Sequence, residues 1–155
     1  MVDQENIRCG FVALVGAPNA GKSTLMNHVM GTKVSIVTHK VQTTRARVVG
    51  VLTHDHDQIV FVDTPGIFSP NRRLERAMVA AAWGGAVDAD NIVLLVDAER
   101  GLGRDVQLII DGLKKAGKTA IISLNKIDLI PREKLLTLAD ELQEAGVFEN
   151  IFMIS

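Results

Sequence analysis

The sequence predicts an α/β fold in which a mostly parallel six-stranded sheet, with one antiparallel edge strand, carries helices on both faces. Short runs rich in valine and isoleucine alternate along the chain with longer helical patterns, as in proteins built from β-α-β units. Only residues 54–57 separate the second run from the third, too few for a crossover helix, so these two strands should be antiparallel neighbours. We expect strands near residues 11–15, 47–53, 58–63, 91–97, 119–125 and 150–154, and helices near residues 22–30, 72–87, 103–116 and 132–145.

The composition indicates one soluble globular domain. A chain of 155 residues is long enough for a substantial core, and 47% of its residues are apolar. The formal net charge of −1 excludes a protein that binds nucleic acid through bulk positive charge. No apolar run reaches the length of about 18 residues that a membrane span needs, and the polar N-terminus argues against a signal peptide. The single cysteine, Cys9, fits a reducing cytosol and is expected to be buried or half-buried.

A glycine-bounded loop joins the first predicted strand to the first predicted helix. Residues 16–23 read GAPNAGKS, which matches the P-loop pattern G-x-x-x-x-G-K-S. Glycine at both ends lets backbone N–H groups approach an anion, and the following helix N-terminus favours negative charge. Lys22 is expected to reach the β- and γ-phosphates, and the Ser23 hydroxyl to bind Mg²⁺. The predicted nucleoside triphosphate site comprises Gly16, Ala17, Pro18, Asn19, Ala20, Gly21, Lys22, Ser23 and Thr24.

The long link between the first helix and the second strand, residues 31–46, lies where phosphate-sensing loops occur. A threonine in such a loop can give its hydroxyl to Mg²⁺ and its N–H to a γ-phosphate, so that the loop responds to the third phosphate. Thr43 and Thr44 are both candidates, and we favour Thr44 as the metal ligand. A threonine-rich edge strand is the alternative interpretation.

The third predicted strand ends in the sequence Asp-Thr-Pro-Gly, residues 63–66. A carboxylate at this position beside a P-loop can hold Mg²⁺, usually through water, which is the role expected of Asp63. The backbone N–H of Gly66 is expected to contact the γ-phosphate, and Thr64 and Pro65 complete the contact segment. Without the P-loop upstream, the same four residues would be interpreted as an ordinary turn.

The fifth predicted strand ends in Asn-Lys-Ile-Asp, residues 125–128, which identifies the base. Guanine presents an N1–H and an exocyclic NH₂ on one edge, and the Asp128 carboxylate can accept from both. Adenine lacks these donors and would leave the charge unpaired. Asn125 can join the base to the P-loop, and the aliphatic stem of Lys126 can cover the purine ring.

At the end of the fourth strand, Asp97 and Gly101 mark only the exit of the chain.

These motifs, in this order and spacing, resemble those of the translation-factor-related class of GTPases, and within it the Era family of bacterial ribosome-assembly GTPases. The single P-loop disfavours the Der family, which has two, and its early position in the chain disfavours the MnmE family. The resemblance rests on residues 9–11, 16–24, 33–36, 42–45, 63–66 and 125–128.

The resemblance implies that residues 1–155 form a P-loop NTPase G domain. This domain would be truncated in its last strand and base-binding loop, so that its last helix would be missing and Ser155 would lie at the base. It implies GTP, GDP and Mg²⁺ as ligands and a GTP-driven checkpoint in 30S subunit assembly. The family binds 16S rRNA mainly through a C-terminal KH domain, which is absent from this sequence. A cytoplasmic monomer with peripheral contact to the inner membrane is also implied.

The resemblance also points to a slow reaction. Ile67 stands where Ras-like proteins carry a glutamine that orients the attacking water. Asn19 matches the P-loop asparagine that helps related GTPases bind K⁺, so K⁺ is an expected cofactor. Catalysis is then expected to depend on Lys22, Thr44, Gly66 and Asn19. The alternatives are a module that binds nucleotide with negligible hydrolysis, which Ile67 favours, and an ATPase on the same P-loop, which Asn125 and Asp128 oppose.

Overall fold

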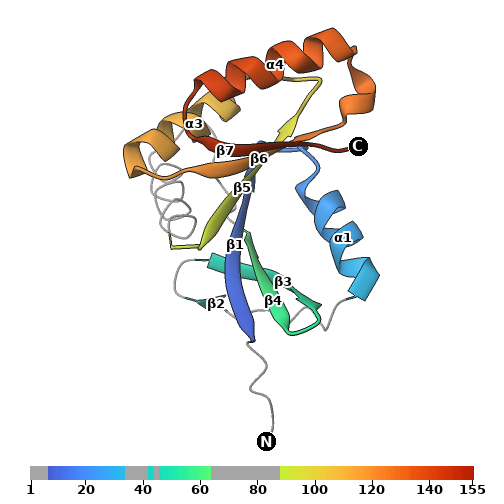
Figure 1. Ribbon diagram of the computed structural model, residues 1–155, viewed down its shortest axis with the longest axis vertical. Helices are drawn as coiled ribbons and strands as arrows, with labels where there is room; N and C mark the ends of the chain where they lie inside the picture. The colour runs from blue at the N-terminus through green and yellow to red at the C-terminus, as the bar shows by residue number, and fades with distance from the viewer. Residues whose placement is uncertain (1–6, 34–41, 44–45, 64–87) are drawn as a thin grey trace, which may run out of the picture.

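The computed structural model describes residues 7–33, 42–43, 46–63 and 88–155 (Figure 1). Several predicted features lie outside the described residues. They are the helix expected over residues 72–87 and the loop residues Thr44, Thr64, Pro65, Gly66 and Ile67.

The described residues form a sheet of seven strands in the order β2-β3-β4-β1-β5-β6-β7. Five strands are parallel to their neighbours, in the order β4, β1, β5, β6 and β7. At the other end of the sheet, β3 is antiparallel to β4, and β2 is antiparallel to β3. The strands are β1 (Arg8–Gly16), β2 (Gln42–Thr43), β3 (Ala46–His54), β4 (Asp57–Asp63), β5 (Asn91–Asp97), β6 (Ala120–Asn125) and β7 (Phe148–Met153).

The predicted α/β class, with its mostly parallel sheet and one antiparallel hairpin, is confirmed. The structure adds β2, which places a two-residue strand outside β3 at the edge of the sheet. This strand lies within residues 31–46, for which a threonine-rich edge strand is the alternative interpretation, and the structure agrees with that alternative at Gln42 and Thr43.

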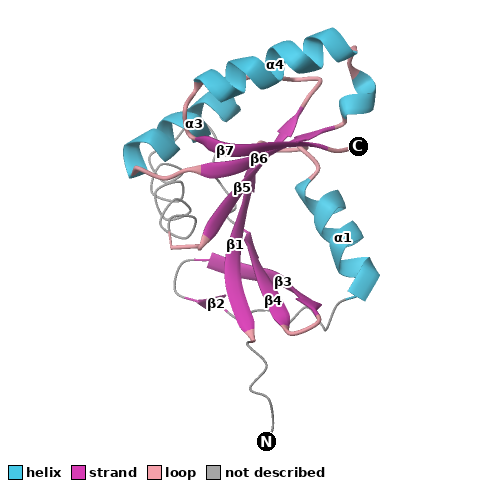
Figure 2. Cartoon of the chain, in the orientation of Figure 1, coloured by secondary structure: helices cyan, strands magenta, loops and turns pink. Residues whose placement is uncertain are grey.

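The described helices lie on both faces of the sheet (Figures 1 and 2). Helices α3 (Arg104–Ala116) and α4 (Arg132–Glu144) lie on one face, and α1 (Lys22–Lys33) lies on the other. The core on the α3 and α4 face contains apolar side chains spaced three and four residues apart along each helix, as an amphipathic helix requires. They are Val106, Ile109, Ile110 and Leu113 of α3 and Leu135, Leu138 and Leu142 of α4.

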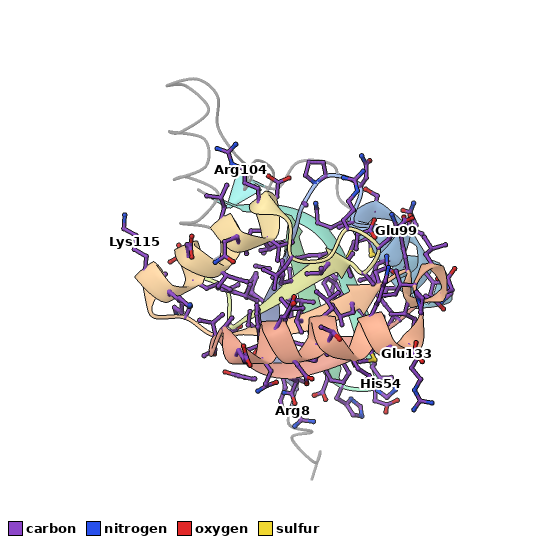
Figure 3. All side chains as sticks on the ribbon, turned by 90° about the horizontal axis from the view of Figure 1, so that it is seen from above. Arg8, His54, Glu99, Arg104, Lys115 and Glu133 are labelled. Carbon is purple, nitrogen blue, oxygen red and sulfur yellow. The ribbon has the colours of Figure 1, made fainter. Side chains whose placement is uncertain are left out.

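The outer side of α3 is mostly polar, and Figure 3 shows Arg104 and Lys115, at opposite ends of this helix, projecting away from the sheet. The helix is capped by Gly117, whose φ of 64° lies in the left-handed region that glycine adopts without strain. None of the described helices is long and apolar enough to cross a lipid bilayer.

A bidentate ion pair joins the first residues of β1 and β4. Arg8 donates from Nε to Oδ1 of Asp57 at 2.9 Å and from Nη2 to Oδ2 at 2.7 Å. The hydrogen bond from this guanidinium lowers the pKa of Asp57 below its ordinary value of 3.8. The pair is exposed, so it helps fix the register Arg8↔Asp57 rather than contributing much to stability.

Cys9 is exposed, so the expectation that it is buried or half-buried is wrong. The reason is that the buried part of β1 begins only at Ala13.

Candidate nucleotide-binding site

The predicted motifs meet at one edge of the sheet because each follows the carboxyl end of a parallel strand. β1 ends at Gly16, which is paired with Leu95 of β5, and β4 ends at Asp63, which is paired with Leu14 of β1. β6 ends at Asn125, which is paired with Asp97 of β5. Ligands of open α/β sheets bind at this edge, where the strand order reverses around β1. The sheet therefore brings the P-loop, Asp63 and residues 125–128 together.

The P-loop folds around the side chain of its own lysine. The Lys22 ammonium donates to the carbonyl oxygen of Gly16 at 2.7 Å and to that of Ala17 at 3.3 Å. Within the loop, the Ala20 N–H donates to the Ala17 carbonyl at 3.2 Å. These contacts place a half-buried positive charge at the start of α1, beside the turn of the loop.

Both glycines of the loop sit where a side chain cannot fit. A Cβ on Gly16 would lie 2.6 Å from the carbonyl oxygen of Leu95, so the end of β1 could not pair closely with β5. Gly21 has φ +102°, and a Cβ there would collide with the Asn125 amide. Between them, Asn19 adopts a left-handed φ of 64°, which asparagine tolerates better than most residues.

The first turn of α1 supplies the remaining groups of a phosphate site. The Leu25 N–H donates to the Gly21 carbonyl at 2.9 Å. The backbone N–H groups of Ser23 and Thr24 lie before this first helical hydrogen bond, so they have no acceptor within the helix. Unpaired N–H groups at a helix N-terminus can bind an anion. Both side chains are exposed, and the Ser23 hydroxyl is an oxygen donor of the kind that Mg²⁺ prefers.

The donors present fit a magnesium ion that is held partly by phosphate. The backbone of Asp63 lies at the end of β4 next to β1, and Thr43 lies in β2, while Thr44 is outside the described residues. Within the described part of the chain, no three His, Cys, Asp or Glu side chains gather around a point. A Mg²⁺ ion beside Ser23 would therefore take most of its ligands from phosphate oxygens and water, which is its usual preference.

The segment 125–128 is joined directly to the P-loop. Asn125 donates from Nδ2 to the Ala20 carbonyl oxygen at 3.0 Å, although 105 residues separate them in the sequence. Asp128 lies one turn further on, in the short 3₁₀ helix η1 (Ile127–Leu129), with an exposed side chain. The exposed carboxylate is accessible to a base bound beside the loop.

The end of the chain lies against the same segment. The Ile154 N–H donates to the Leu124 carbonyl at 2.8 Å, and the Ile154 carbonyl accepts from the Ile127 N–H at 3.4 Å. Ser155 follows Ile154 directly, and its role at the base stays a prediction from the resemblance.

Asp97 is the site residue that the sequence did not identify. Its side chain is 6% exposed, and its Oδ2 lies 2.6 Å from the ammonium nitrogen of Lys126. The same ammonium donates to the Asn19 carbonyl at 3.0 Å. A signal existed in the sequence, because an acidic residue that directly follows a fully apolar parallel strand lies at the ligand-binding edge.

The surroundings of Asp97 favour its charged form. Burial opposes ionisation, but the hydrogen bond from Lys126 and the backbone N–H groups of Glu99 and Arg100 outweigh it. The pKa of Asp97 therefore lies below its ordinary value of 3.8. Lys126 adopts a left-handed φ of 61°, which costs a residue with a Cβ roughly 1 kcal/mol. The two polar contacts of its ammonium help to offset this strain.

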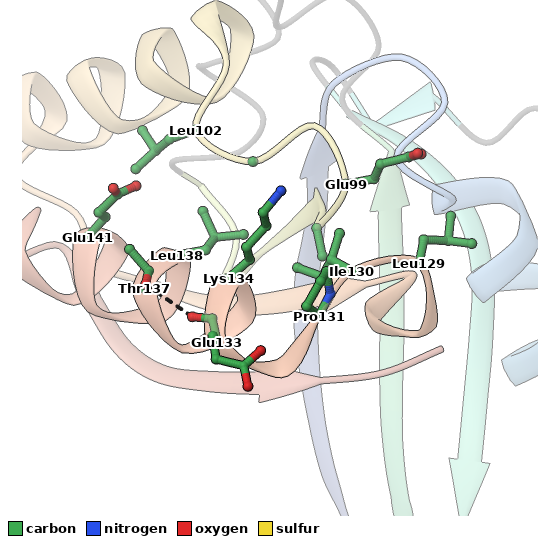
Figure 4. Close-up of a pocket in the computed structure, with 12 residues that line it drawn as sticks. Glu99, Leu102, Leu129, Ile130, Pro131, Glu133, Lys134, Thr137, Leu138 and Glu141 are labelled. Atoms are coloured by element: carbon green, nitrogen blue, oxygen red, sulfur yellow. Dashed lines mark hydrogen bonds between the residues drawn. The ribbon is translucent and has the colours of Figure 1, made fainter.

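A shallow groove of about 530 Å³ lies beside this site, between the loop after β5 and the start of α4 (Figure 4). Glu99 and Leu129 lie at its end nearest the P-loop, and Leu102 and Leu138 line it further away. None of its described lining residues belongs to the predicted nucleotide site, so the groove is a neighbouring surface.

Comparison with known proteins identifies the same class as the motifs. The sequence pattern of the family described as "50S ribosome-binding GTPase" matches residues 11–126. The chain is 60% identical over 148 residues to GTPase Era of Sinorhizobium medicae and 60% identical to GTPase Era of Agrobacterium fabrum. Both alignments cover 96% of this chain but only 48% and 47% of the relatives. The chain thus spans about half the length of the curated relatives that it matches.

Solved structures agree with the sequence relatives. A variant of Era from Aquifex aeolicus bound to GDP and AlF₄⁻ superposes with a TM-score of 0.73 at 41% identity, over 96% of this chain and 51% of that one. Era in complex with MgGDPNP and nucleotides 1506–1542 of 16S ribosomal RNA superposes with a TM-score of 0.75, also at 41% identity and with the same coverage.

Replacing Gly21 should show how closely the P-loop and residue Asn125 must approach. Gly21→Ala introduces a methyl group against the Asn125 amide at a strained backbone angle, so nucleotide affinity should fall at least about tenfold. Gly31→Ala is the matched control, because nothing lies within 4 Å of its Cβ position in helix α1, and affinity should be unchanged. Titration with a fluorescent guanine nucleotide measures both. Equal affinities for the two variants would contradict this geometry.

Stability should depend on the ionisation of Asp97 in acid. Because the pKa of Asp97 is lowered, its contribution is complete above about pH 4 and is lost as the pH falls through the folded-state pKa. At pH 7, Asp97→Asn should lower the free energy of unfolding by about 1.5 kcal/mol. The difference between the two proteins should shrink as the pH falls below about 4 and through the lowered pKa of Asp97. Urea denaturation across this range measures it, and a difference that does not change with pH would contradict the assignment.

Proposed function

This chain belongs to the family of 50S ribosome-binding GTPases, and on that premise we propose that it is the G domain of an Era-type switch that binds and hydrolyses GTP. The observation that carries the proposal is the hydrogen bond from Asn125 to the Ala20 carbonyl. It joins the segment that recognises guanine to the loop that binds phosphate, so a single ligand with both chemical groups fits the site. GTP and GDP have both groups.

The proposed roles follow from the position of each residue. The P-loop from Gly16 to Thr24 would surround the phosphates. Its Lys22 ammonium, which binds the Gly16 carbonyl in the structure, would reach the β- and γ-phosphates. Ser23 and Asp63 hold Mg²⁺, the metal present with GDPNP in the Era–RNA complex. Asp128 accepts from guanine N1–H and NH₂, with Ser155 beside it. Thr44 and Gly66, with Thr64 and Pro65, remain predicted contacts of the third phosphate.

The reaction is GTP + H₂O → GDP + phosphate, and it should be slow without help. Ile67 cannot orient water, so transition-state charge must be stabilised by Lys22, Mg²⁺ and a further cation. We propose K⁺ as this cation, with Asn19 among its ligands. The left-handed conformation of Asn19 places this residue at the turn of the P-loop. A module that binds nucleotide with negligible hydrolysis is the alternative that Ile67 favours.

The biological role is proposed from the similarity to Era. The Era structure with 16S rRNA and the 60% identity to curated Era proteins support a switch in 16S rRNA maturation and 30S subunit assembly. The chain spans 48% of such a relative, so residues 1–155 would supply the G domain and a KH domain elsewhere in the full protein would bind RNA. We propose a cytoplasmic monomer, with any membrane contact peripheral.

Changing Asp128 should change which base is bound. Asp128→Asn offers guanine one acceptor and one donor, so GDP affinity should fall on the order of 100-fold while xanthosine diphosphate affinity rises. Asp140→Asn makes the same change on the exposed face of α4 and should alter neither affinity. Competition binding with both nucleotides measures the effect. If the Asp128 variant kept its preference for GDP, the base-edge assignment would be wrong.

Potassium should accelerate hydrolysis. Replacing NaCl by KCl at equal ionic strength should raise single-turnover GTP hydrolysis roughly tenfold, because K⁺ would stabilise negative charge that develops between the β- and γ-phosphates. Asn19→Ala should reduce the potassium effect. Equal rates in the two salts would remove K⁺ from the mechanism, and no turnover in either salt would favour the binding-module alternative.

The ribosomal role is tested by RNA binding. The full-length protein should bind an RNA that covers nucleotides 1506–1542 of 16S rRNA, the segment in the Era complex, whereas residues 1–155 alone should bind it at least about tenfold more weakly. Filter binding with GTP analogue present measures both affinities. Failure of the full-length protein to prefer this RNA over a scrambled sequence would contradict the proposed role.

A further inference from the structure

We propose that Asp97 is a positioning residue for the nucleotide site: its buried carboxylate holds Lys126 across the P-loop and thereby couples the base-binding segment to the phosphate-binding loop. This inference rests on the proposed function and assigns a role to a residue outside the recognised motifs. Asp97 acts through Lys126 and is not itself placed against the nucleotide.

The contact has the geometry of a strong interaction. Oδ2 of Asp97 lies 2.6 Å from the Lys126 ammonium, and Oδ1 accepts the Glu99 N–H at 3.0 Å, so both carboxylate oxygens are engaged. The side chain of Asp97 is 6% exposed and that of Lys126 is 35% exposed. Water therefore competes little at the carboxylate, and charge-assisted hydrogen bonds in such surroundings are strong.

The backbone holds the two partners in place. Asp97 and Asn125 are register partners at the ends of β5 and β6, and the Ala98 N–H donates to the Asn125 carbonyl at 2.9 Å. Lys126 follows Asn125 and turns into the left-handed region at φ 61°. The turn returns the lysine side chain towards Asp97 and the P-loop. The carboxylate thus stabilises a strained conformation within the base-recognition motif.

The other end of the connection is the P-loop backbone. Lys126 donates to the Asn19 carbonyl at 3.0 Å, and its neighbour Asn125 donates to the next carbonyl, that of Ala20, also at 3.0 Å. Two adjacent residues of one loop therefore bind two adjacent carbonyls of the other. Only the hydrogen bond to Asn19 is made by Lys126, whose positive charge is balanced by Asp97. Removing the negative charge of Asp97 should therefore weaken the hydrogen bond to Asn19 and leave the one from Asn125 to Ala20 intact.

The expected consequence is faster release of nucleotide. Without the Asp97 charge, the Lys126 ammonium loses its ionic partner, its stem is no longer held at the purine position, and the Asn19 carbonyl is released. A hydrogen bond between charged groups corresponds to roughly a tenfold change or more in an equilibrium or rate. We therefore expect GDP to dissociate about tenfold faster from Asp97→Asn, which keeps the shape of the side chain.

The test is a double-variant cycle on the full chain, with the dissociation rate of a fluorescent GDP as readout. The variants are Asp97→Asn, Lys126→Met and the two combined, with Glu99→Gln as the matched control. Glu99 is exposed, two residues from Asp97, and its loss of charge should change the rate less than about twofold. If Asp97 acts through Lys126, the double variant should release GDP at the rate of Lys126→Met alone.

Each result decides the inference. A GDP dissociation rate of Asp97→Asn within twofold of that of the unmodified chain would overturn the inference. So would a double variant whose rate increase equals the product of the two single increases, because independent losses of structure would multiply in this way. If Asp97→Asn does not fold, the comparison uses two variants of Lys126. Lys126→Arg keeps a positive charge opposite Asp97 and should release GDP slowly, whereas Lys126→Met lacks this charge and should release GDP fast. Equal rates for these two variants would overturn the inference. If the unmodified chain binds no GDP, the proposed function itself fails, and this inference fails with it.

Discussion

The site depends on one close approach: the Asn125 amide lies against the P-loop at Gly21 and binds the Ala20 carbonyl. This approach requires that residue 21 have no Cβ and that the backbone adopt φ +102° there. It brings together two segments whose strands, β1 and β6, are separated in the sheet by β5. The segments predicted to bind phosphate and base therefore form one connected structure.

Two lysine ammonium groups donate to backbone carbonyls of the P-loop. Lys22 donates to carbonyls at the start of the P-loop, and Lys126 donates to the Asn19 carbonyl near its end. The positive charge of Lys126 is balanced by the buried Asp97 carboxylate. Lys22 lies at the start of α1, where a phosphate group is expected to bind.

Much of this arrangement could be predicted from the sequence, because it depends on local patterns. Apolar runs located the strands, and the short link at residues 54–57 predicted the antiparallel pair. The motifs at residues 16–24 and 125–128 follow strand ends, so their meeting followed from topology. The Asp97–Lys126 pair could not be predicted, because it depends on the register of β5 and β6 and on the left-handed turn at Lys126. The exposure of Cys9 likewise depends on where burial begins along β1.

The most direct test of the account is calorimetric titration of the folded chain with GDP and with ADP in the presence of Mg²⁺. The phosphate loop alone would bind both nucleotides, and only the connected base-recognition segment distinguishes them. We predict that GDP binds at least about 1,000-fold more tightly than ADP, because adenine would leave the Asp128 carboxylate without its two donors. Equal affinities, or no binding of either nucleotide, would contradict the central claim that one connected site recognises both phosphate and guanine.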